Sequence, residues 1–326
     1  EMTAGFRAFQ EIAAREGLTA VHDAMTTRPM LEAYAALERE GDLRMQVTAS
    51  ISCEPEQAPE QAEELPWVCG EYSKDLFRTH AAKIFLDGVV EAHTAFLLEP
   101  YRDRPDCRGE PIWPNDTFTR MVTALDRNKL QVHVHAVGDG AARMALDAFE
   151  TAYAANGFRD ARHQIAHLDL LSPEDISRFG ALGVVANVQP AWFYFDANFF
   201  DQLLPYLGEP RAFALYRARS LMDAGAMVAC GSDWPFGGES VTFRPLDVLR
   251  IGATRLGIEK YFDSVYIPGE CLPLAPLLDA YTYRAAHAHF LERETGSIAP
   301  GNYADLVVID QDLFAIPAEE IHKAKV

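Results

Sequence analysis

Short apolar runs alternate with longer amphipathic stretches along almost the whole of this 326-residue chain. The runs have the length and composition of β-strands, and the stretches between them have helical spacing of apolar residues. Repeated strand–helix units predict a parallel sheet, because parallel neighbours need a long crossover connection. The predicted strands are Gly17–Asp23, Leu43–Ser50, Ala82–Asp87, Leu130–Ala136, Gln164–Asp169, Val184–Gln189 and Met227–Asp233.

Two features favour a (β/α)8 TIM-type barrel over an open, doubly wound sheet. Polar residues able to do chemistry lie at the C-terminal ends of several predicted strands, where a barrel has its active site. No Gly-rich phosphate fingerprint follows the first strand, as a dinucleotide fold would require. Seven strands are visible where a barrel has eight, so we expect residues 1–290 to form a barrel that lacks one strand.

The pattern changes after residue 290. Gly296–Asp310 contains two glycine turns and an apolar run with no helix after it. This run predicts a strand that leaves the barrel, and residues 291–326 are therefore expected to begin a small β domain. Within the barrel, Ser172-Pro173-Glu174-Asp175 predicts a helix start with Ser172 as the N-cap.

The net charge of −19 argues against a nucleic-acid partner, because phosphate binding needs clustered Lys and Arg. It also argues against adhesion to an anionic membrane surface, and no apolar run reaches the roughly 18 residues of a membrane span. The five cysteines are odd in number, scattered and without a CxxC pair. This pattern predicts reduced thiols in a cytoplasmic protein.

Two histidines, His133 and His135, are separated by one residue in a predicted strand that ends at a Gly-Asp-Gly turn. Alternate side chains share a face of a strand, so both rings are able to point into a barrel mouth. A His-x-His pair indicates metal binding. The alternative is that one or both rings make structural hydrogen bonds, and His135, nearer the rim, is the stronger candidate ligand.

Two further strands end in groups able to bind a metal. In RHQIAHLD, His167 lies at the strand's C-terminal rim, whereas His163 lies at its entrance and is expected on the surface. Asp233 ends the apolar run MVACGSD, and a carboxylate there needs a metal, a charge partner or a catalytic role. A helix N-cap is the alternative for Asp233.

Lys83 lies in the otherwise apolar segment AAKIFLDG. A buried lysine must be paired or deprotonated, and a neutral amine can take up carbon dioxide to become a carbamate. The alternatives are a salt bridge to Asp87 or Glu91, or a snorkelling surface lysine. Lys83 and the three candidates named above occupy four different strands, which is difficult to ascribe to chance.

These segments resemble the YtcJ-like group of the amidohydrolase superfamily. The similar stretches include KIFLDG, VHVHAVGDGA, QIAHLDLLSPED, GSDWP and GSIAPGNYADLVVID, and they follow the family's order from Gly17 onward. The resemblance identifies the seven visible strands as strands two to eight of the barrel. The family's first strand carries a His-x-His pair that nothing before Gly17 supplies, so we expect the chain to be an N-terminally truncated fragment.

The resemblance implies four metal ligands, namely Lys83, His135, His167 and Asp233, with Lys83 as a carbamate where it is modified. It implies one or two divalent ions, zinc or a similar metal. Asp233 would act as the catalytic proton shuttle in the hydrolysis of a C–N bond in a small amide-type substrate. An aromatic segment, Trp192–Phe195, follows the sixth visible strand and suggests an apolar substrate, although packing is the commoner use of such residues.

Two other functions stay open. A catalytically inactive barrel that binds or assembles with other molecules would suit the absent ligand pair. An open-sheet nucleotide-binding protein could use HAVGDG as a phosphate loop, although the glycine spacing and the lysine of such loops are absent. The sequence also leaves open a homo-oligomer.

Overall fold

A computed structural model of the chain describes residues 1–326 except 58, 237–241, 260–261 and 263. In the described residues one seven-stranded parallel sheet runs in chain order, with each strand paired to the next. All seven predicted strands are confirmed, although β3 begins at Phe77 instead of Ala82 and β7 ends at Cys230 instead of Asp233. The strands are β1 (Ala20–Thr26), β2 (Gln46–Ser52), β3 (Phe77–Phe85), β4 (Gln131–Ala136), β5 (Gln164–His167), β6 (Val185–Val188) and β7 (Met227–Cys230).

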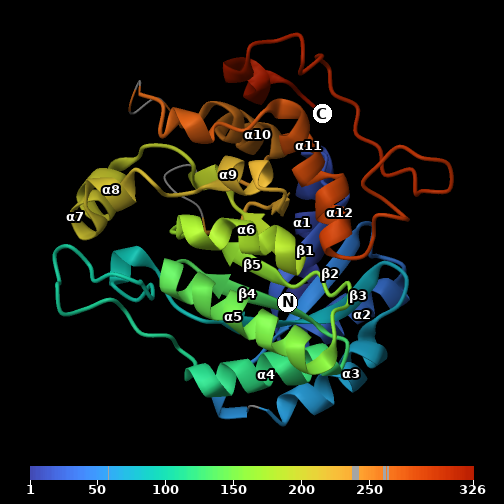
Figure 1. Cartoon of the computed structure of the whole chain (residues 1–326). Helices are drawn as coiled ribbons and strands as arrows, with labels where there is room; N and C mark the ends of the chain where they lie inside the picture. The colour runs from blue at the N-terminus through green and yellow to red at the C-terminus, as the bar shows by residue number, and fades with distance from the viewer. Residues whose placement is uncertain (58, 237–241, 260–261, 263) are drawn as a thin grey trace.

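Helices cover the outside of the curved sheet. In Figure 1, α4, α5, α6, α9 and α10 follow one another around the strands from the bottom to the top of the view. The sheet with its outer helices is a half-barrel of the (β/α) type, with β1 and β7 as its two edges. The α-helices are α1 (Met2–Arg15), α2 (Arg28–Glu40), α3 (Gln61–Tyr72), α4 (Asn115–Arg127), α5 (Asp139–Asn156), α6 (Pro173–Leu182), α7 (Leu204–Leu207), α8 (Glu209–Ala212), α9 (Ala218–Asp223), α10 (Pro245–Thr254), α11 (Leu274–Tyr281) and α12 (Tyr283–Ala288).

The main core lies between the strands and these helices. Val132 and Val134 on one face of β4 are fully buried, as are Met121 on α4 and Phe149 on α5. Burying a side chain of this size contributes roughly 1.5–3 kcal/mol. The other face of each strand is therefore free to carry polar groups, and the packed helices hold the strand ends in fixed positions.

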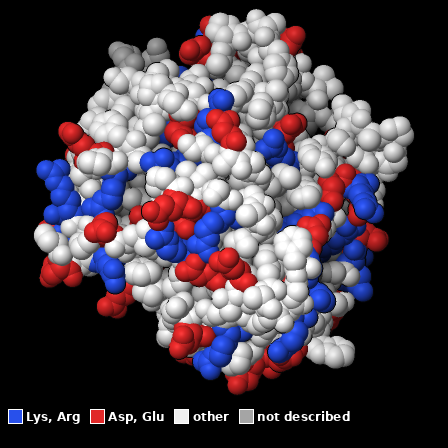
Figure 2. Space-filling model, in the orientation of Figure 1, with Lys and Arg blue, Asp and Glu red and all other residues white. Residues whose placement is uncertain are grey.

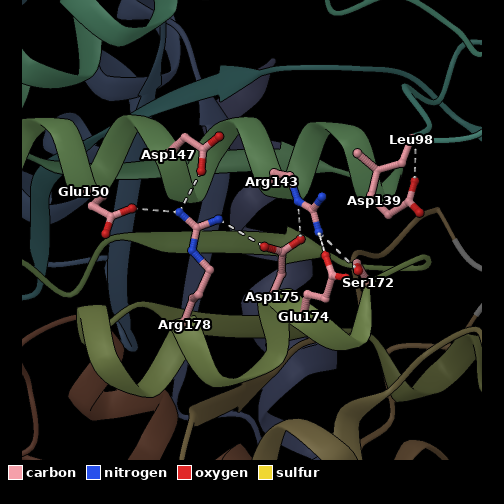
Figure 3. Close-up of polar contacts among 9 residues, drawn as sticks. All are labelled: Leu98, Asp139, Arg143, Asp147, Glu150, Ser172, Glu174, Asp175 and Arg178. Atoms are coloured by element: carbon pink, nitrogen blue, oxygen red, sulfur yellow. Dashed lines mark hydrogen bonds and ion pairs between the residues drawn. The ribbon is translucent and has the colours of Figure 1, made fainter.

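Ion pairs join α5 to α6, the helices that follow β4 and β5 (Figure 3). Arg143 on α5 binds Asp175 at 2.9 Å, and Arg178 on α6 binds Asp175 at 3.0 Å and Asp147 on α5 at 2.7 Å. Ser172 occupies the predicted N-cap position of α6 but makes no capping hydrogen bond; its hydroxyl accepts one from Arg143 instead. The two helices are thus held together beside the strands that carry the candidate histidines.

Replacing Asp175 with alanine is expected to lower the free energy of unfolding by about 2 kcal/mol, because the side chain is only 2% exposed and serves two arginines. Glu174→Ala is the matched control. Glu174 also binds Arg143, but its side chain is 81% exposed, so its loss should cost less than about 0.5 kcal/mol. Urea unfolding of both variants measures the difference, and equal losses would contradict a buried ion-pair centre.

The C-terminal segment departs from the sequence expectation. Gly296–Asp310 forms no strand, and its apolar residues Ile298 and Val308 are 92% and 82% exposed. A strand exists only when another strand pairs with it, and among the described residues no strand pairs with this segment. The predicted strand is therefore wrong for this structure. A separate β domain beginning at residue 291 stays a prediction.

The surface and the cysteines agree with the composition. On the face drawn in Figure 2, Lys and Arg side chains are interleaved with Asp and Glu. All five cysteines are free thiols. Among the described helices, none combines the length and apolar character that crossing a membrane would require.

Candidate functional site

The inner face of the sheet carries two rows of side chains across the strands. Paired residues of parallel strands point the same way, so the register defines each row. Lys83 on β3 pairs with His133 on β4, which pairs with Gln164 on β5. Nearer the C-terminal ends, Phe85 pairs with His135. Polar and titratable groups thus line the interior of the half-barrel, as a site at the barrel mouth requires.

Lys83 is buried, with 3% of its surface exposed, as its apolar surroundings predict. Its Nζ atom lies 4.9 Å from the centre of the Phe85 ring. No ion pair within 4 Å joins it to Asp87 or Glu91 in the described structure, so the salt-bridge alternative is wrong. Burial lowers the pKa of Lys83 to about 8, while the charge of Asp233 acts in the opposite direction. The amine is therefore able to lose its proton close to neutral pH.

His135 lies on the inner face near the C-terminal end of β4, and its ring has a defined orientation. Its Nε2 atom lies 3.1 Å from the carbonyl oxygen of Gly88. A carbonyl only accepts hydrogen bonds, so Nε2 carries the proton and Nδ1 keeps its lone pair in the neutral ring. Burial, together with the charge of Lys83, lowers the pKa of His135 to about 4. The ring is consequently neutral at physiological pH.

His167 is the last residue of β5 and has a backbone φ of +79°. This left-handed conformation breaks the strand alternation, and the His167 ring lies 4.4 Å from the His135 ring. Its Nδ1 atom lies 3.0 Å from Oε1 of Gln189, so Nδ1 donates and Nε2 keeps the lone pair. Burial, with the nearby His135 and Lys83, places its pKa well below the usual value.

Asp233 follows β7 and is partly buried. Residues 234–236 form a turn, so Asp233 is not a helix N-cap. Burial raises the pKa of its carboxyl to about 6, and the charge of Lys83 lowers it. The charges of Asp233 and Lys83 therefore influence each other, although the two groups form no ion pair within 4 Å.

The structure brings the four predicted residues to the same end of the sheet without forming a ready-made metal site. Within the described part of the chain, no group of three or more His, Cys, Asp or Glu side chains is arranged to hold a metal ion. The two histidines are in contact, and the lysine and the aspartate interact through their charges. The ligand assignment stays a prediction.

Several site residues were not identified from the sequence. The ring centre of His22 on β1 lies 5.0 Å from that of His133. The Nε2 atom of His22 is hydrogen-bonded to the hydroxyl of Ser50 at 2.8 Å. Both ring nitrogens of His133 are buried without a hydrogen-bond partner. Gln189, the last residue of the predicted strand Val184–Gln189, orients His167 through the hydrogen bond to its Nδ1 atom. The alternating pattern of β4 is the signal that placed His133 on the inner face, but nothing local pointed to His22.

Asp87, two residues after β3, binds the backbone of two other segments. Its buried carboxylate accepts hydrogen bonds from the backbone NH groups of Phe96, Val137 and Gly138, at 2.8–3.0 Å. Burial raises its pKa to about 7 despite these bonds. The NH groups of Val137 and Gly138 in the HAVGDG loop are thereby occupied by a carboxylate, which argues against its use as a phosphate loop. A Cβ atom on Gly138 would lie 2.0 Å from the oxygen of Phe96, so this close approach requires glycine.

His163 corrects an expectation. It is fully buried rather than on the surface. Its Nδ1 atom accepts a hydrogen bond from the backbone NH of Val132, and Nε2 lies 3.4 Å from Asp126. The ring stacks on Phe149 with 4.7 Å between ring centres. The residue is structural, because the outer-face position at the strand entrance is covered by α5.

Proteins of known sequence are similar to much of this chain. Protein LONG AFTER FAR-RED 3 from Arabidopsis thaliana is 37% identical over 228 residues, which are 70% of this chain and 38% of that protein. Putative amidohydrolase YtcJ from Bacillus subtilis (strain 168) is 31% identical over 242 residues, 74% and 44% of the two chains. N-substituted formamide deformylase from Arthrobacter pascens is 24% identical over 333 residues, 95% and 55%. The chain thus spans 38–55% of the length of these relatives.

Solved structures share the fold, and a family model matches the whole chain. An uncharacterized metal-dependent hydrolase from Pyrococcus furiosus has a TM-score of 0.75 and 28% identity, covering 94% of this chain and 59% of that one. Atrazine chlorohydrolase from Arthrobacter aurescens TC1, complexed with zinc, has a TM-score of 0.59 and 16% identity, covering 98% and 67%. The model described as "Amidohydrolase family" matches residues 1–326. The chain therefore belongs to the amidohydrolase family.

Proposed function

We propose that this protein hydrolyses the C–N bond of a small amide or formamide-like substrate with one or two divalent metal ions, zinc or a similar metal. The observation that carries the proposal is the contact between His135 and His167, whose rings each leave one nitrogen free and both lie within the electrostatic influence of Lys83. Membership of the amidohydrolase family supports hydrolysis. The names of the deformylase relative and of the zinc-containing chlorohydrolase support the type of bond and the metal.

The donors fit a zinc-like ion. His135 offers Nδ1 and His167 offers Nε2, and both rings stay neutral at physiological pH. Asp233 offers carboxylate oxygens. Lys83 offers either a neutral amine or, after uptake of carbon dioxide, the oxygens of a carbamate. Zinc prefers such nitrogen and oxygen ligands in catalytic sites.

Each residue has a separate chemical task. When bound, a divalent metal polarises a substrate carbonyl and lowers the pKa of water. Asp233 would take a proton from the attacking water and deliver it to the departing nitrogen, so that one carboxylate acts first as base and then as acid. Gly88 and Gln189 would hold the two imidazoles in the tautomers that leave Nδ1 and Nε2 unprotonated.

Zinc titration of the purified chain tests the metal site. His135→Ala and His167→Ala should each weaken zinc binding more than about 100-fold, because each removes a direct ligand. His322→Ala on the short helix η6 (Ala318–Lys323), outside the barrel mouth, is the control and should leave zinc affinity within twofold. Calorimetry gives the affinities, and metal analysis gives the number of ions. Equal zinc affinity in all four proteins would place any zinc elsewhere.

A second candidate function is a barrel that binds other molecules without catalysis. The observation in its favour is that the described residues hold no group of three or more His, Cys, Asp or Glu side chains arranged for a metal. The same titration separates the two functions. Stoichiometric zinc that depends on His135 and His167 supports the hydrolase, whereas a chain that takes up no zinc supports the binding module.

A further inference from the structure

Trp192 is an aromatic residue in direct contact with a candidate metal ligand. It ends the short helix η3 (Pro190–Trp192) that follows β6. Its indole stacks on the ring of His167, with 5.5 Å between ring centres and 16° between planes. The indole is only partly buried. A flat apolar surface therefore stands at the mouth of the half-barrel beside His167.

The segment that carries Trp192 is fastened to the end of β5. Phe193, the next residue, is buried and stacks on Tyr216 with 5.1 Å between ring centres. The backbone NH of Tyr216 donates to the carbonyl oxygen of Asp169, two residues after His167, at 2.9 Å. The indole is thus part of a packed wall rather than a free side chain, and stacking on it costs little conformational entropy.

The turn after Asp233 is linked to the Trp192 indole through its backbone. The indole Nε1 of Trp192 donates to the carbonyl oxygen of Phe236 at 3.2 Å. The Phe236 ring is 70% exposed. The hydrogen bond connects the segment after β6 to the turn after Asp233. The Trp192 indole is therefore held from two directions, by the ring of His167 and by the backbone of the turn after Asp233.

We propose that the Trp192 indole, held between His167 and the turn after Asp233, is an aromatic subsite that takes a planar, apolar substituent of the amide substrate. This inference rests on the proposed function and adds the substrate class to it. Flat rings stack on an indole in offset or edge-on arrangements, and such contacts add to the gain from burying apolar surface. A small aliphatic substituent would not reach the indole, so water would remain there and the substrate would gain no binding free energy from the subsite.

Hydrolysis of matched amides by the zinc-loaded protein tests the subsite. N-phenylformamide carries a ring on nitrogen, benzamide carries a ring on the acyl carbon, and N-methylformamide carries no ring. In Trp192→Ala, kcat/KM for one ring-bearing amide should fall roughly tenfold or more, while N-methylformamide changes less than about twofold. The ring-bearing amide that responds shows which side of the scissile bond faces the subsite. Equal falls for all three amides would overturn the proposal.

Two further variants separate stacking from a general disturbance. Trp192→Phe keeps a ring but loses the Nε1 hydrogen bond, so it should recover most of the lost selectivity. Phe200→Ala is the control, because Phe200 is 41% exposed but packs on Phe195 and Phe262 instead of on His167. It should leave the selectivity between amides unchanged. A loss of selectivity in Phe200→Ala equal to that in Trp192→Ala would contradict a local subsite.

Binding measurements keep the subsite testable if no amide is hydrolysed. Aniline and benzoate are the ring-bearing products of the two aromatic amides, and calorimetry measures their affinity for the chain without catalysis. The proposal expects Trp192→Ala to weaken at least one of them roughly tenfold and Trp192→Phe to restore it. That result without hydrolysis would defeat the proposed function and uphold the subsite. If the amides are hydrolysed but Trp192→Ala changes neither product binding nor selectivity, the proposed function stands and the subsite is wrong.

Discussion

Replacing Asp233 with asparagine is expected to lower kcat for amide hydrolysis by about 10²–10⁴, the usual contribution of a general acid–base residue. Asparagine keeps the shape of the side chain but cannot accept and return a proton. Its amide oxygen still allows metal coordination, so zinc should remain bound in the variant. A large loss of kcat with zinc still bound would show that Asp233 transfers the proton. If Asp233 were needed only to hold the metal, zinc binding and kcat would be lost together.

The role of Asp233 as a base also predicts how the hydrolysis rate changes with pH. Burial raises the pKa of the Asp233 carboxyl to about 6, and a bound cation would lower it by favouring the carboxylate. A base must be ionised to accept a proton, so the rate should rise with pH across a limb at or below about pH 6. Asp233→Asn should lack this limb.

The control for this variant is Asp223→Asn. Asp223 lies on α9, pairs with Arg219 and is 60% exposed, so it should leave kcat within twofold and keep the acidic limb. Full activity in Asp233→Asn would show that another group moves the proton. An acidic limb that persists in a slow Asp233→Asn variant would lead to the same conclusion.

The sequence predicted most of the fold because the strand signals are local. Each of the seven strands is a short apolar run, and the burial of Lys83 follows from its apolar neighbours. The prediction of a strand in Gly296–Asp310 rested on the same local signal, and here it was wrong. The segment's composition is right, but pairing depends on a partner strand that composition does not reveal, and no described segment pairs with it.

The site was predicted less completely than the fold, because its geometry depends on contacts between distant segments. The positive φ of His167 turns its ring towards His135, and strand alternation alone would have placed it on the other face. Asp87 was considered as a salt-bridge partner of Lys83, whereas it binds backbone NH groups up to 51 residues away in the chain. The partners that select the tautomers, Gly88 and Gln189, also come from other strand ends.

Lys83→Met should weaken zinc binding more than about 100-fold if Lys83 is a ligand, and should also remove a pH dependence. Methionine keeps the apolar stem in its buried position, so the fold should tolerate the change. Burial lowers the pKa of the amine to about 8, so it is still mostly protonated at pH 7. Coordination, either directly or as a carbamate, requires the neutral amine.

The expected pH dependence follows from that proton. Below about pH 8 direct coordination must displace one proton from Lys83, so zinc affinity should rise by up to about tenfold per pH unit between pH 6 and 8. Carbamate formation from the ammonium and carbon dioxide releases two protons, one from the ammonium and one when the amine adds, so its pH dependence should be at least as steep. The histidines do not produce this slope, because His135 has a pKa of about 4 and is already neutral. Lys83→Met should therefore bind zinc weakly and almost independently of pH over this range. Lys74→Met, on the exposed connection before β3, should keep both the affinity and the slope.

Added bicarbonate distinguishes the two forms of Lys83. If the carbamate is the ligand, bicarbonate should strengthen zinc binding in the wild type and not in Lys83→Met, and the mass of the zinc-bound protein should increase by one carbon dioxide. A neutral amine ligand would give the pH slope without the bicarbonate effect. If Lys83→Met bound zinc with wild-type affinity and wild-type pH dependence, Lys83 would not be a ligand. Its buried position on β3 would then be structural only.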